Sequence, residues 1–499
     1  MKTLLLALVT LFATTPLLAA EPLEIGLTGS GAVIQGLAVS AARKTSRTVL
    51  LIGGLQGQDE SVKRVQSAAA NYEAQRGTRR DFNLIAIPLA NPDGAALKFP
   101  PSGVAYRENP EANALWRWIG LHAPDLVIVE SVDDAGLASA LSSMAVAEVG
   151  RIPARPAAAT PFDFKAKDLA PSEAHVEMDR RRARTPHALA DELAQFYGHD
   201  FDQPVYIQAI ALIAQIRLGH VDDVKKLVEP YVNGTKDSLQ RPSSLVLAGH
   251  TVFTELARKT GDARYVQMVK KIGDLGFDAD GHMKESMPYH DEYSDSVYMG
   301  TAIAAQAGAL TGDRKYFDLA ARHVAFMQKL VLRPDGLYRH SPATQAAWGR
   351  GNGFPAIGLA LTLAEFPKKH PDFPRLLQSY QAHMAALAPY QNRDGLWRNV
   401  VDHPGSYAEL TSTAMIGFSM LQGVKHGWLS KKEYQPLVDK AWRAVLEHTG
   451  SQGHMVDSCE STQKLKTEDE YVHRAALFGT EPRAGAMVMM FATALAGLN

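Results

Sequence analysis

The tetrapeptide DGLY at residues 335–338 recurs in variant form along the second half of the chain. The related turns are DGHM (280–283), DGLW (394–397) and QGHM (452–455), and their glycines stand 55 to 59 residues apart. A second echo joins TGDARY, which starts at residue 260, to TGDRKY, which starts at 311. Self-similarity at a period of this length indicates a repeated supersecondary unit.

The segments between these turns are apolar and helical in pattern, for example TAIAAQAGAL (301–310) and FPAIGLALTLAEF (354–366). Each period holds two helices and two turns, so the unit is a helical hairpin, and the roughly 310 residues from 187 onward hold five to six of them. The inner-helix sequences are rich in Ala, Gly and Ser, which suits crowded packing in a closed ring. We therefore predict an all-α (α/α)6 toroid over residues 187–499, with a cleft on the face that collects the glycine loops.

The first part of the chain follows a different pattern. Short apolar runs at 48–54, 83–90 and 125–131 alternate with helical stretches at 60–75 and 110–122. This alternation predicts an α/β domain over residues 22–150, with helices covering a sheet. The next 36 residues, 151–186, contain five prolines and little apolar periodicity, and are predicted to be an inter-domain linker.

The first twenty residues contain a lysine at position 2, an apolar run, and small residues at Ala19 and Ala20, which predicts a secretory signal peptide over residues 1–20. The single cysteine, Cys459, excludes an internal disulfide, and the combination favours a periplasmic or secreted protein of a bacterium. No later stretch is long and apolar enough to predict a membrane span.

The charge balance restricts the classes of partner. The 52 basic residues nearly balance the 53 acidic ones, so no net field attracts nucleic acid or a membrane surface. No phosphate-binding loop, nucleotide fingerprint, nucleophile elbow or metal cluster is evident, and we expect no cofactor and no metal. The sequence leaves the oligomeric state open.

In the α/β part, GGLQGQDES (53–61), NPDG (91–94) and PDLVIVES (124–131) together resemble the skeleton of zinc carboxypeptidases. The positions of that family's two histidines and glutamate hold Gln56, Ser131 and Asp59 here. Because zinc prefers imidazole and carboxylate ligands, the resemblance implies a domain that has lost its metal. Such a domain is kept for stability, docking or sugar binding.

In the helical part, the sequence resembles the unsaturated glucuronyl and rhamnogalacturonyl hydrolases of glycoside hydrolase family 105, close to family 88. The stretches that carry the resemblance are YSDSVYMG (293–300), TGDRKYFDLA (311–320), DGLYRH (335–340), WGRGNGF (348–354) and SYAELTSTAM (406–415). The family's fold is an (α/α)6 toroid. The implied substrate is an oligosaccharide with a terminal uronate that carries a C4=C5 double bond, which the enzyme protonates and hydrates.

The resemblance places the acid/base group at Asp295. From the residues alone, Asp295 is either a proton donor or a cap at the start of the following helix, since Asp is common at that position. Burial against Tyr293 and Tyr298 would raise the pKa of the carboxyl, as a proton donor near neutral pH requires, whereas a helix N-terminus lowers it. We expect the burial to dominate and assign catalysis to Asp295.

The resemblance also implies the substrate-binding residues. Arg350 is expected to hold the uronate carboxylate, because a planar guanidinium fits two oxygens. Trp348 either stacks on the sugar or belongs to the core, and Asn352 either binds a hydroxyl or fixes its loop. The resemblance further implies that His340, Tyr293 and Phe354 face the substrate.

The chain departs from the family pattern at two places. Phe354 stands where the motif normally has tryptophan, which keeps a stacking surface but loses an N–H donor. Ser243 and Ser244 stand where the family has a second aspartate, so either His250 or Glu409 replaces it, the enzyme is slower, or the substrate differs. Glu409 is alternatively an acid that caps the start of a helix. Two alternatives therefore stay open, a glycosidase for saturated glucuronides and a carbohydrate-binding protein that has lost its activity.

Overall fold

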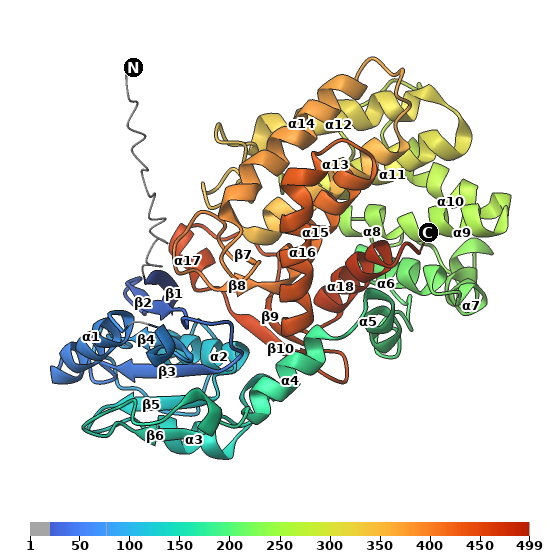
Figure 1. Ribbon diagram of the computed structural model, residues 1–499. Helices are drawn as coiled ribbons and strands as arrows, with labels where there is room; N and C mark the ends of the chain where they lie inside the picture. Colours follow the sequence, from blue (N-terminus) through green and yellow to red (C-terminus); the bar gives the residue numbers. More distant parts are fainter. Residues whose placement is uncertain (1–19, 76, 499) are drawn as a thin grey trace, which may run out of the picture.

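The structure is a computed structural model that describes residues 20–75 and 77–498. The predicted signal peptide falls on residues 1–20 and so lies, except for Ala20, outside the described residues. The described chain forms an α/β part, coloured from blue to teal in Figure 1, and a larger helical part coloured from green to red. No helix in the described ranges combines the length and the apolarity that crossing a membrane requires.

The α/β part is built on a six-stranded sheet in the order β1-β2-β4-β3-β5-β6. Strands β4, β3, β5 and β6 are parallel, whereas β1 and β2 are antiparallel additions at one edge. The strands are β1 (Glu21–Leu27), β2 (Val33–Val39), β3 (Thr48–Gly53), β4 (Asn83–Ile87), β5 (Leu126–Glu130) and β6 (Ala154–Pro156). The predicted α/β architecture of this part is confirmed.

Two hydrophobic cores lie on opposite faces of this sheet. Along β3, Leu50 and Ile52 join the core that includes α2 (Pro110–His122) and α3 (Leu137–Ser143). The intervening Val49 and Leu51 join the core formed with α1 (Glu60–Glu73). This alternation follows from the two-residue period of a strand and explains why its sequence is continuously apolar.

The segment predicted as a linker, residues 151–186, is more ordered than the sequence indicated. It contains β6, which extends the sheet, and helix α4 (Glu173–Arg182), which packs against α16 (Lys431–His448) of the helical part. Strand β6 is only three residues long and proline-bounded, so it lacks the apolar run by which a strand is found in sequence. The segment therefore belongs partly to the α/β part and partly to the interface between the two parts.

The helical part contains, among the described residues, six helices that pack one against the next in chain order. The last of them packs back against the first, as the contacts between α18 and α6 show. These helices are α6 (Tyr206–Arg217), α8 (Ser244–Gly249), α11 (Ser296–Thr311), α13 (Gly349–Glu365), α15 (Leu410–Lys425) and α18 (Pro482–Leu495). We call this set the inner helices.

Further helices pack outside the inner ones and complete the hairpins. They are α5 (Pro186–Leu193), α7 (Val221–Val232), α10 (Ala263–Asp274), α12 (Arg314–Val331), α14 (Phe373–Leu387) and α16. Helix α9 (Thr251–Thr260) instead continues α8 after His250 and packs against the inner helices α6 and α11. The TGD echo makes two of the connections, since Gly261 and Gly312 end α9 and α11 in the left-handed conformation. Asp262 and Asp313 then cap α10 and α12, which explains why the motif repeats.

The helical part also contains strands, which the sequence did not predict. Two hairpins are present, β7 (Trp397–Arg398) with β8 (Ala408–Glu409), and β9 (His454–Cys459) with β10 (Ala476–Thr480). Between β9 and β10 runs a connection, residues 460–475, that includes the short helix α17 (Glu468–Val472). We call residues 460–475 the covering segment, because its contacts described below lie over the start of the inner helices.

The glycines of WGRGNGF allow the start of α13 to pack closely against its neighbours. A Cβ atom on Gly349 would lie 2.7 Å from the carbonyl oxygen of Arg398 and 3.0 Å from Oγ of Ser412. A Cβ atom on Gly351 would lie 3.0 Å from Oγ of Ser294. The small residues of this motif are thus explained first by packing between α11, α13 and α15.

Candidate active site

The predicted site residues lie where the inner helices begin. Asp295, Trp348, Glu409 and Glu481 each occupy the position immediately before α11, α13, α15 and α18, respectively. Three of the four are acids, and the amide groups at a helix N-terminus favour negative charge nearby. The question is which of these acids is free for chemistry.

Two of the three acids are engaged as helix caps. Glu409 accepts hydrogen bonds from the backbone N–H groups of Thr411 and Ser412, and Glu481 accepts one from Ala484. Asp295 makes no such bond, and its backbone already has helical dihedral angles. The capping interpretation of Asp295 therefore fails, and that of Glu409 holds.

Burial gives Asp295 an unusual acidity. Its side chain is only 8% exposed, and this burial raises the pKa of the carboxyl to about 7. The guanidinium groups of Arg350, Arg474 and Arg483 act in the opposite direction and limit the rise. A buried carboxyl that is half protonated near neutral pH is suited to donate a proton and to take one back.

His340 is a titratable neighbour of this carboxyl. Its Nε2 atom lies 3.6 Å from Oδ1 of Asp295, and its Nδ1 atom lies 2.6 Å from the hydroxyl of Tyr471. Burial, with help from Arg474 and Arg350, holds the pKa of His340 well below its ordinary value. The imidazole is therefore neutral at physiological pH.

Arg350 and Trp348 form one buried unit beside His340. The guanidinium of Arg350 lies 4.5 Å from the ring of Trp348, and the ring of His340 lies 4.4 Å from the same tryptophan. The terminal nitrogens of Arg350 donate to the carbonyl oxygens of Cys459 and Ser461. Trp348 is fully buried and donates from Nε1 to Asn399, so it backs the site as part of the core and does not present a stacking surface.

A cluster of buried polar atoms around Asp295 makes no hydrogen bond within the described chain. It comprises Oη of Tyr206, Oγ of Ser294, Oδ1 of Asp295, Nε2 of His340, Nε of Arg350, Nη1 of Arg474 and Nε of Arg483. Electrostatic interactions connect Asp295 and Tyr206 to the arginines of this set. Because a buried polar group without a partner costs about 1–3 kcal/mol, such a concentration favours the binding of a polar, oxygen-rich ligand.

The remaining predicted residues divide into two kinds. Tyr293 lies in the site, with its ring 5.0 Å from that of His340 and nearly parallel to it. Asn352 accepts a hydrogen bond from the backbone N–H of Tyr338 and donates to the carbonyls of Tyr338 and Trp348, so it fixes the loop. Phe354 packs against Tyr206 and Tyr298 in the main core. Of the two alternatives for Asn352, the structure shows the second, in which its amide fixes the loop. The expectation that Phe354 faces the substrate is not met, because its side chain is packed in the main core.

Neither candidate replaces the missing second aspartate. Ser243 caps α8. The Nδ1 atom of His250 is hydrogen-bonded to the carbonyl oxygen of Val246, and its Nε2 atom to the hydroxyl of Ser238. Burial lowers the pKa of His250 to about 4, which agrees with a neutral histidine held inside the fold. Glu409 is engaged as the cap of α15 and also accepts from the backbone N–H of Cys459.

Sequence reasoning missed Tyr471, Arg474 and Arg483, which complete the surroundings of Asp295. Tyr471 and Arg474 belong to the covering segment, and the guanidinium of Arg474 lies 4.9 Å from the rings of both Trp348 and Tyr471. The capping box of Thr467 and Glu470 is readable in the sequence and marks the start of α17. It does not indicate that this helix folds back onto His340, which lies 131 positions earlier.

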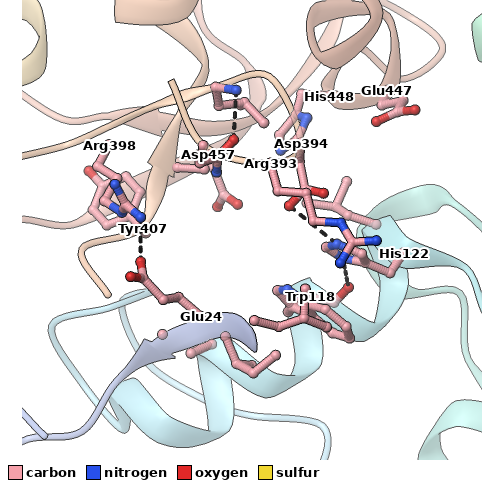
Figure 2. A pocket seen from close by; sticks show the side chains of 18 of the residues that line it. Glu24, Trp118, His122, Arg393, Asp394, Arg398, Tyr407, Glu447, His448 and Asp457 are labelled. Carbon is pink, nitrogen blue, oxygen red and sulfur yellow. Dashed lines mark hydrogen bonds and ion pairs between the residues drawn. The ribbon is translucent and has the colours of Figure 1, made fainter. Parts of the chain in front are cut away.

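A cavity of about 640 Å³ lies elsewhere, between the α/β part and the helical part (Figure 2). Glu24, Trp118 and His122 line it from the α/β part. Asp394, Arg398, Tyr407 and Asp457 line it from the helical part. Its opposed charges are already paired, Glu24 with Arg398 and His122 with Asp394, so it serves as a polar interface more than as a second reaction centre.

Two groups of side chains in the described ranges are close enough to hold a metal ion, and neither includes a residue of the site. One is Asp318, His370 and Asp372, and the other is the exposed group Asp278, Asp280 and His282. In the first, His370 already bonds from Nε2 to Asp318 and accepts at Nδ1 from the backbone N–H of Asp372. The hydrogen bonds of His370, which join Asp318 of α12 to the start of α14, account for the closeness of these three side chains.

Comparison with known families gives the relationship of the helical part. Residues 179–497 match the sequence model of Glycosyl Hydrolase Family 88. The chain belongs to this family. The match includes all of the inner helices and Asp295, and it excludes the six-stranded sheet. The resemblance of the α/β part to zinc carboxypeptidases stays a prediction from its sequence.

Several curated relatives of this chain are named as unsaturated rhamnoglycuronyl or rhamnogalacturonyl hydrolases. The unsaturated 3S-rhamnoglycuronyl hydrolase of Alteromonas sp. (strain LOR) is 26% identical over 175 residues, which cover 33% of this chain and 42% of that protein. The unsaturated rhamnogalacturonyl hydrolase YesR of Bacillus subtilis is 24% identical over 245 residues, which cover 45% and 69% of the two chains. The chain thus spans less than half the length of the first of these relatives.

Solved structures share the fold of the helical part. A possible member of the GH105 family from Salmonella enterica superposes with a TM-score of 0.52 at 19% identity, covering 64% of this chain and 94% of that one. A glycoside hydrolase from family 105 of C. acetobutylicum superposes with a TM-score of 0.50 at 19% identity, covering 62% of this chain and 98% of that one. At these identities the likeness concerns the fold.

Proposed function

We propose that this family 88 member removes a terminal 4,5-unsaturated uronate from an oligosaccharide. The observation that carries the proposal is the state of Asp295, which alone among the three acids before inner helices is uncapped, and whose pKa burial raises to about 7. The names of the relatives from Alteromonas and Bacillus subtilis support the class of substrate.

The reaction needs a single carboxyl group that works in both directions. Protonated Asp295 gives its proton to C4, and water adds at C5 while its own proton returns to the Asp295 carboxylate. The hemiketal formed at C5 opens, the ring oxygen becomes the hydroxyl of a hemiacetal at C1, and the bond from C1 to the leaving sugar then breaks. One water molecule is consumed, and Asp295 ends in the protonation state in which it began.

The arginines are suited to bind the carboxylate of the uronate. Two terminal nitrogens of Arg350 are occupied by backbone carbonyls, but its Nε–H, an Nη1 group of Arg474 and the Nε–H of Arg483 are without partners in the described chain. An anion placed among them gains charge-assisted hydrogen bonds. Tyr293, beside His340, offers an aromatic ring at the same place.

The arrangement favours hydration over the ordinary glycosidase mechanism. That mechanism uses two free carboxyl groups on either side of the bond. Here Glu409 and Glu481 are held in helix caps, and Ser243 stands at the position of the family's second aspartate. A saturated glucuronide would therefore lack its second catalytic acid.

Two broader features belong to the same proposal. We infer that the inner helices form the (α/α)6 toroid of the family, which the return contact of α18 with α6 supports. We also propose that residues 1–20 direct export to the periplasm or the medium, where lyase products are released.

The test is incubation with unsaturated disaccharides made by several lyases. We expect loss of the ultraviolet absorbance of the conjugated double bond with at least one of them, and no cleavage of matched saturated glucuronides. Cleavage of the saturated compounds alone would replace this proposal by an ordinary glycosidase. Binding without turnover, unchanged in Asp295→Asn, would indicate a carbohydrate-binding protein.

A further inference from the structure

We infer that the α/β part positions Arg350, and that Arg117 and Tyr106 are positioning residues for substrate binding in the helical part. The inference rests on the proposed function for the meaning of the binding step. It assigns a role to a domain that the family match over residues 179–497 does not include.

The connection begins at Asp457, a buried residue of β9. Arg117 of α2 donates from Nη1 to Oδ1 of Asp457, and the hydroxyl of Tyr106 donates to Oδ2 over 3.0 Å. The Asp457 side chain is 4% exposed, and the α/β part supplies a partner to each of its oxygens, a cation to Oδ1 and a neutral hydroxyl to Oδ2. A buried carboxylate depends strongly on such partners.

Asp457 is also the point at which β9 is irregular. Val456 pairs with Phe478 and Ser458 pairs with Leu477, so Asp457 is an extra residue in the ladder, and its φ is +60°. A bulge of this kind redirects the strand that follows it. The Arg117–Asp457 pair therefore fixes the direction in which the chain leaves the bulge.

The chain that leaves the bulge supplies the support of Arg350. Two residues after Asp457, the carbonyl of Cys459 accepts from Nη1 of Arg350, and the carbonyl of Ser461 accepts from Nη2. The backbone N–H of Cys459 donates to Glu409, which caps α15. The position of the guanidinium is thus set jointly by the helical part and, through Asp457, by the α/β part.

Aromatic packing strengthens the same junction. The ring of Tyr106 lies 4.4 Å from that of Tyr407 and is almost parallel to it, and Tyr407 lies beside Asp457 on the wall of the cavity in Figure 2. Leu27 of β1 joins Trp348 and Tyr471 in one apolar cluster. The contact between the two parts therefore reaches the residues behind the site.

The chain offers a matched control. Arg107 also crosses from the α/β part, where it bonds to Glu460 over 2.9 Å, but both side chains are substantially exposed, at 50% and 31%. An exposed pair contributes little to geometry or stability. Arg107→Met thus removes an inter-domain ion pair without disturbing Asp457.

The experiment compares Tyr106→Phe, Arg117→Lys, Arg117→Met and Arg107→Met in the full chain. With an unsaturated disaccharide that the wild type consumes, we expect Arg117→Met to raise KM about tenfold or more with kcat within about twofold, because the carboxylate is bound equally before and during reaction. Arg117→Lys should restore part of the affinity, Tyr106→Phe should have a smaller effect, and Arg107→Met should match the wild type.

A second measurement keeps the inference independent of turnover. Hydrogen exchange at the amide of Cys459, which is bonded to Glu409, should be faster in Arg117→Met and unchanged in Arg107→Met. If the wild type turns over no unsaturated substrate, the proposed function fails and the exchange data still decide the positioning. Unchanged KM and unchanged exchange, or a loss of thermal stability with KM unaltered, would overturn the inference while leaving the proposed function intact.

Discussion

The Oδ1 atom of Asp295 lies 3.6 Å from the Nε2 atom of His340, and neither atom has a hydrogen-bond partner in the described chain. Asp295 stands at the start of α11 and His340 lies in the loop before α13, 45 positions later. Burial acts on both in the direction of the neutral form, since it raises the pKa of the carboxyl and lowers that of the imidazole. The pair is thus prepared for proton transfer and does not form a salt bridge at rest.

Replacing the proton donor should nearly abolish turnover. Asp295→Asn keeps the shape and burial of the side chain but cannot donate and recover a proton, so we expect kcat on an unsaturated disaccharide to fall by about 10²–10⁴-fold. The measurement is the initial rate of loss of ultraviolet absorbance. Asp291→Asn, an exposed acid four residues earlier, serves as control and should retain the wild-type rate. Equal rates for wild type and Asp295→Asn would remove Asp295 from the mechanism.

The pH profile should report the pKa of Asp295. Activity requires the protonated carboxyl, so kcat/KM should be constant at mildly acidic pH and should fall, by about tenfold per pH unit, above a midpoint of about 7. Titration of His340 should not change the slope of the kcat/KM profile near neutral pH, because the pKa of His340 is well below its ordinary value. A profile that instead rises through pH 7 would mean that the ionised carboxylate starts the reaction.

The same group should make the wild type less stable as pH rises. The pKa of Asp295 is about 7 when folded and 3.8 ordinarily, so its contribution to stability is fully present below about pH 4 and is lost as pH rises through about 7. Three pKa units correspond to a cost of up to about 4 kcal/mol at alkaline pH. Asp295→Asn avoids this cost. The Tm of the variant minus that of the wild type should therefore be larger at pH 8 than at pH 5. A constant difference between the two pH values would contradict the raised pKa.

The sequence predicted the elements better than the contacts between distant segments. Helix α2 was predicted with its observed bounds, because its apolar period and Pro110 are local signals. Asp295, His340 and Arg350 were grouped correctly because their motifs are short and each stands at the start of an inner helix or on the turn before one. Whether Asp295 caps α11 could not be predicted, since a free and a capping aspartate look alike in sequence.

The covering segment shows why the rest could not be predicted. Its sequence is mostly polar and lacks periodicity, and the site residues that Tyr471 and Ser461 contact, His340 and Arg350, lie more than 100 positions earlier in the chain. Asn352 shows the same limit in a loop, because the sequence could not decide whether its amide binds a substrate hydroxyl or, as the structure shows, the main chain of Tyr338, 14 positions earlier. These contacts depend on packing between distant segments, which a local sequence pattern does not specify.

Tyr471 should position His340 from the covering segment. Its hydroxyl bonds to Nδ1 of His340 over 2.6 Å and accepts from the backbone N–H of Leu465. Tyr471→Phe therefore leaves a buried imidazole nitrogen and a partly buried N–H group without this partner. We expect a loss of stability of about 1–3 kcal/mol, measured by denaturant unfolding. We also expect lower kcat at a temperature where the variant is folded. Tyr390→Phe, at a partly exposed tyrosine of the helical part, is the control, and matching kcat values for the two variants would leave Tyr471 with a structural role only.

The glycine that opens α13 should be intolerant of a single methyl group. In Gly349→Ala the new Cβ would lie 2.7 Å from the carbonyl oxygen of Arg398, a backbone atom that cannot rotate away, and 3.0 Å from Ser412. Overpacking of this kind costs about 1–3 kcal/mol, and because Trp348 and Arg350 flank the position, substrate affinity should fall as well. At Gly29 a Cβ would meet only ordinary contacts, the nearest at 3.7 Å from Glu111, so Gly29→Ala should leave Tm and KM unchanged. Were Gly349→Ala as stable and as active as Gly29→Ala, the close approach of α13 to α15 would not be what sets the geometry of the site.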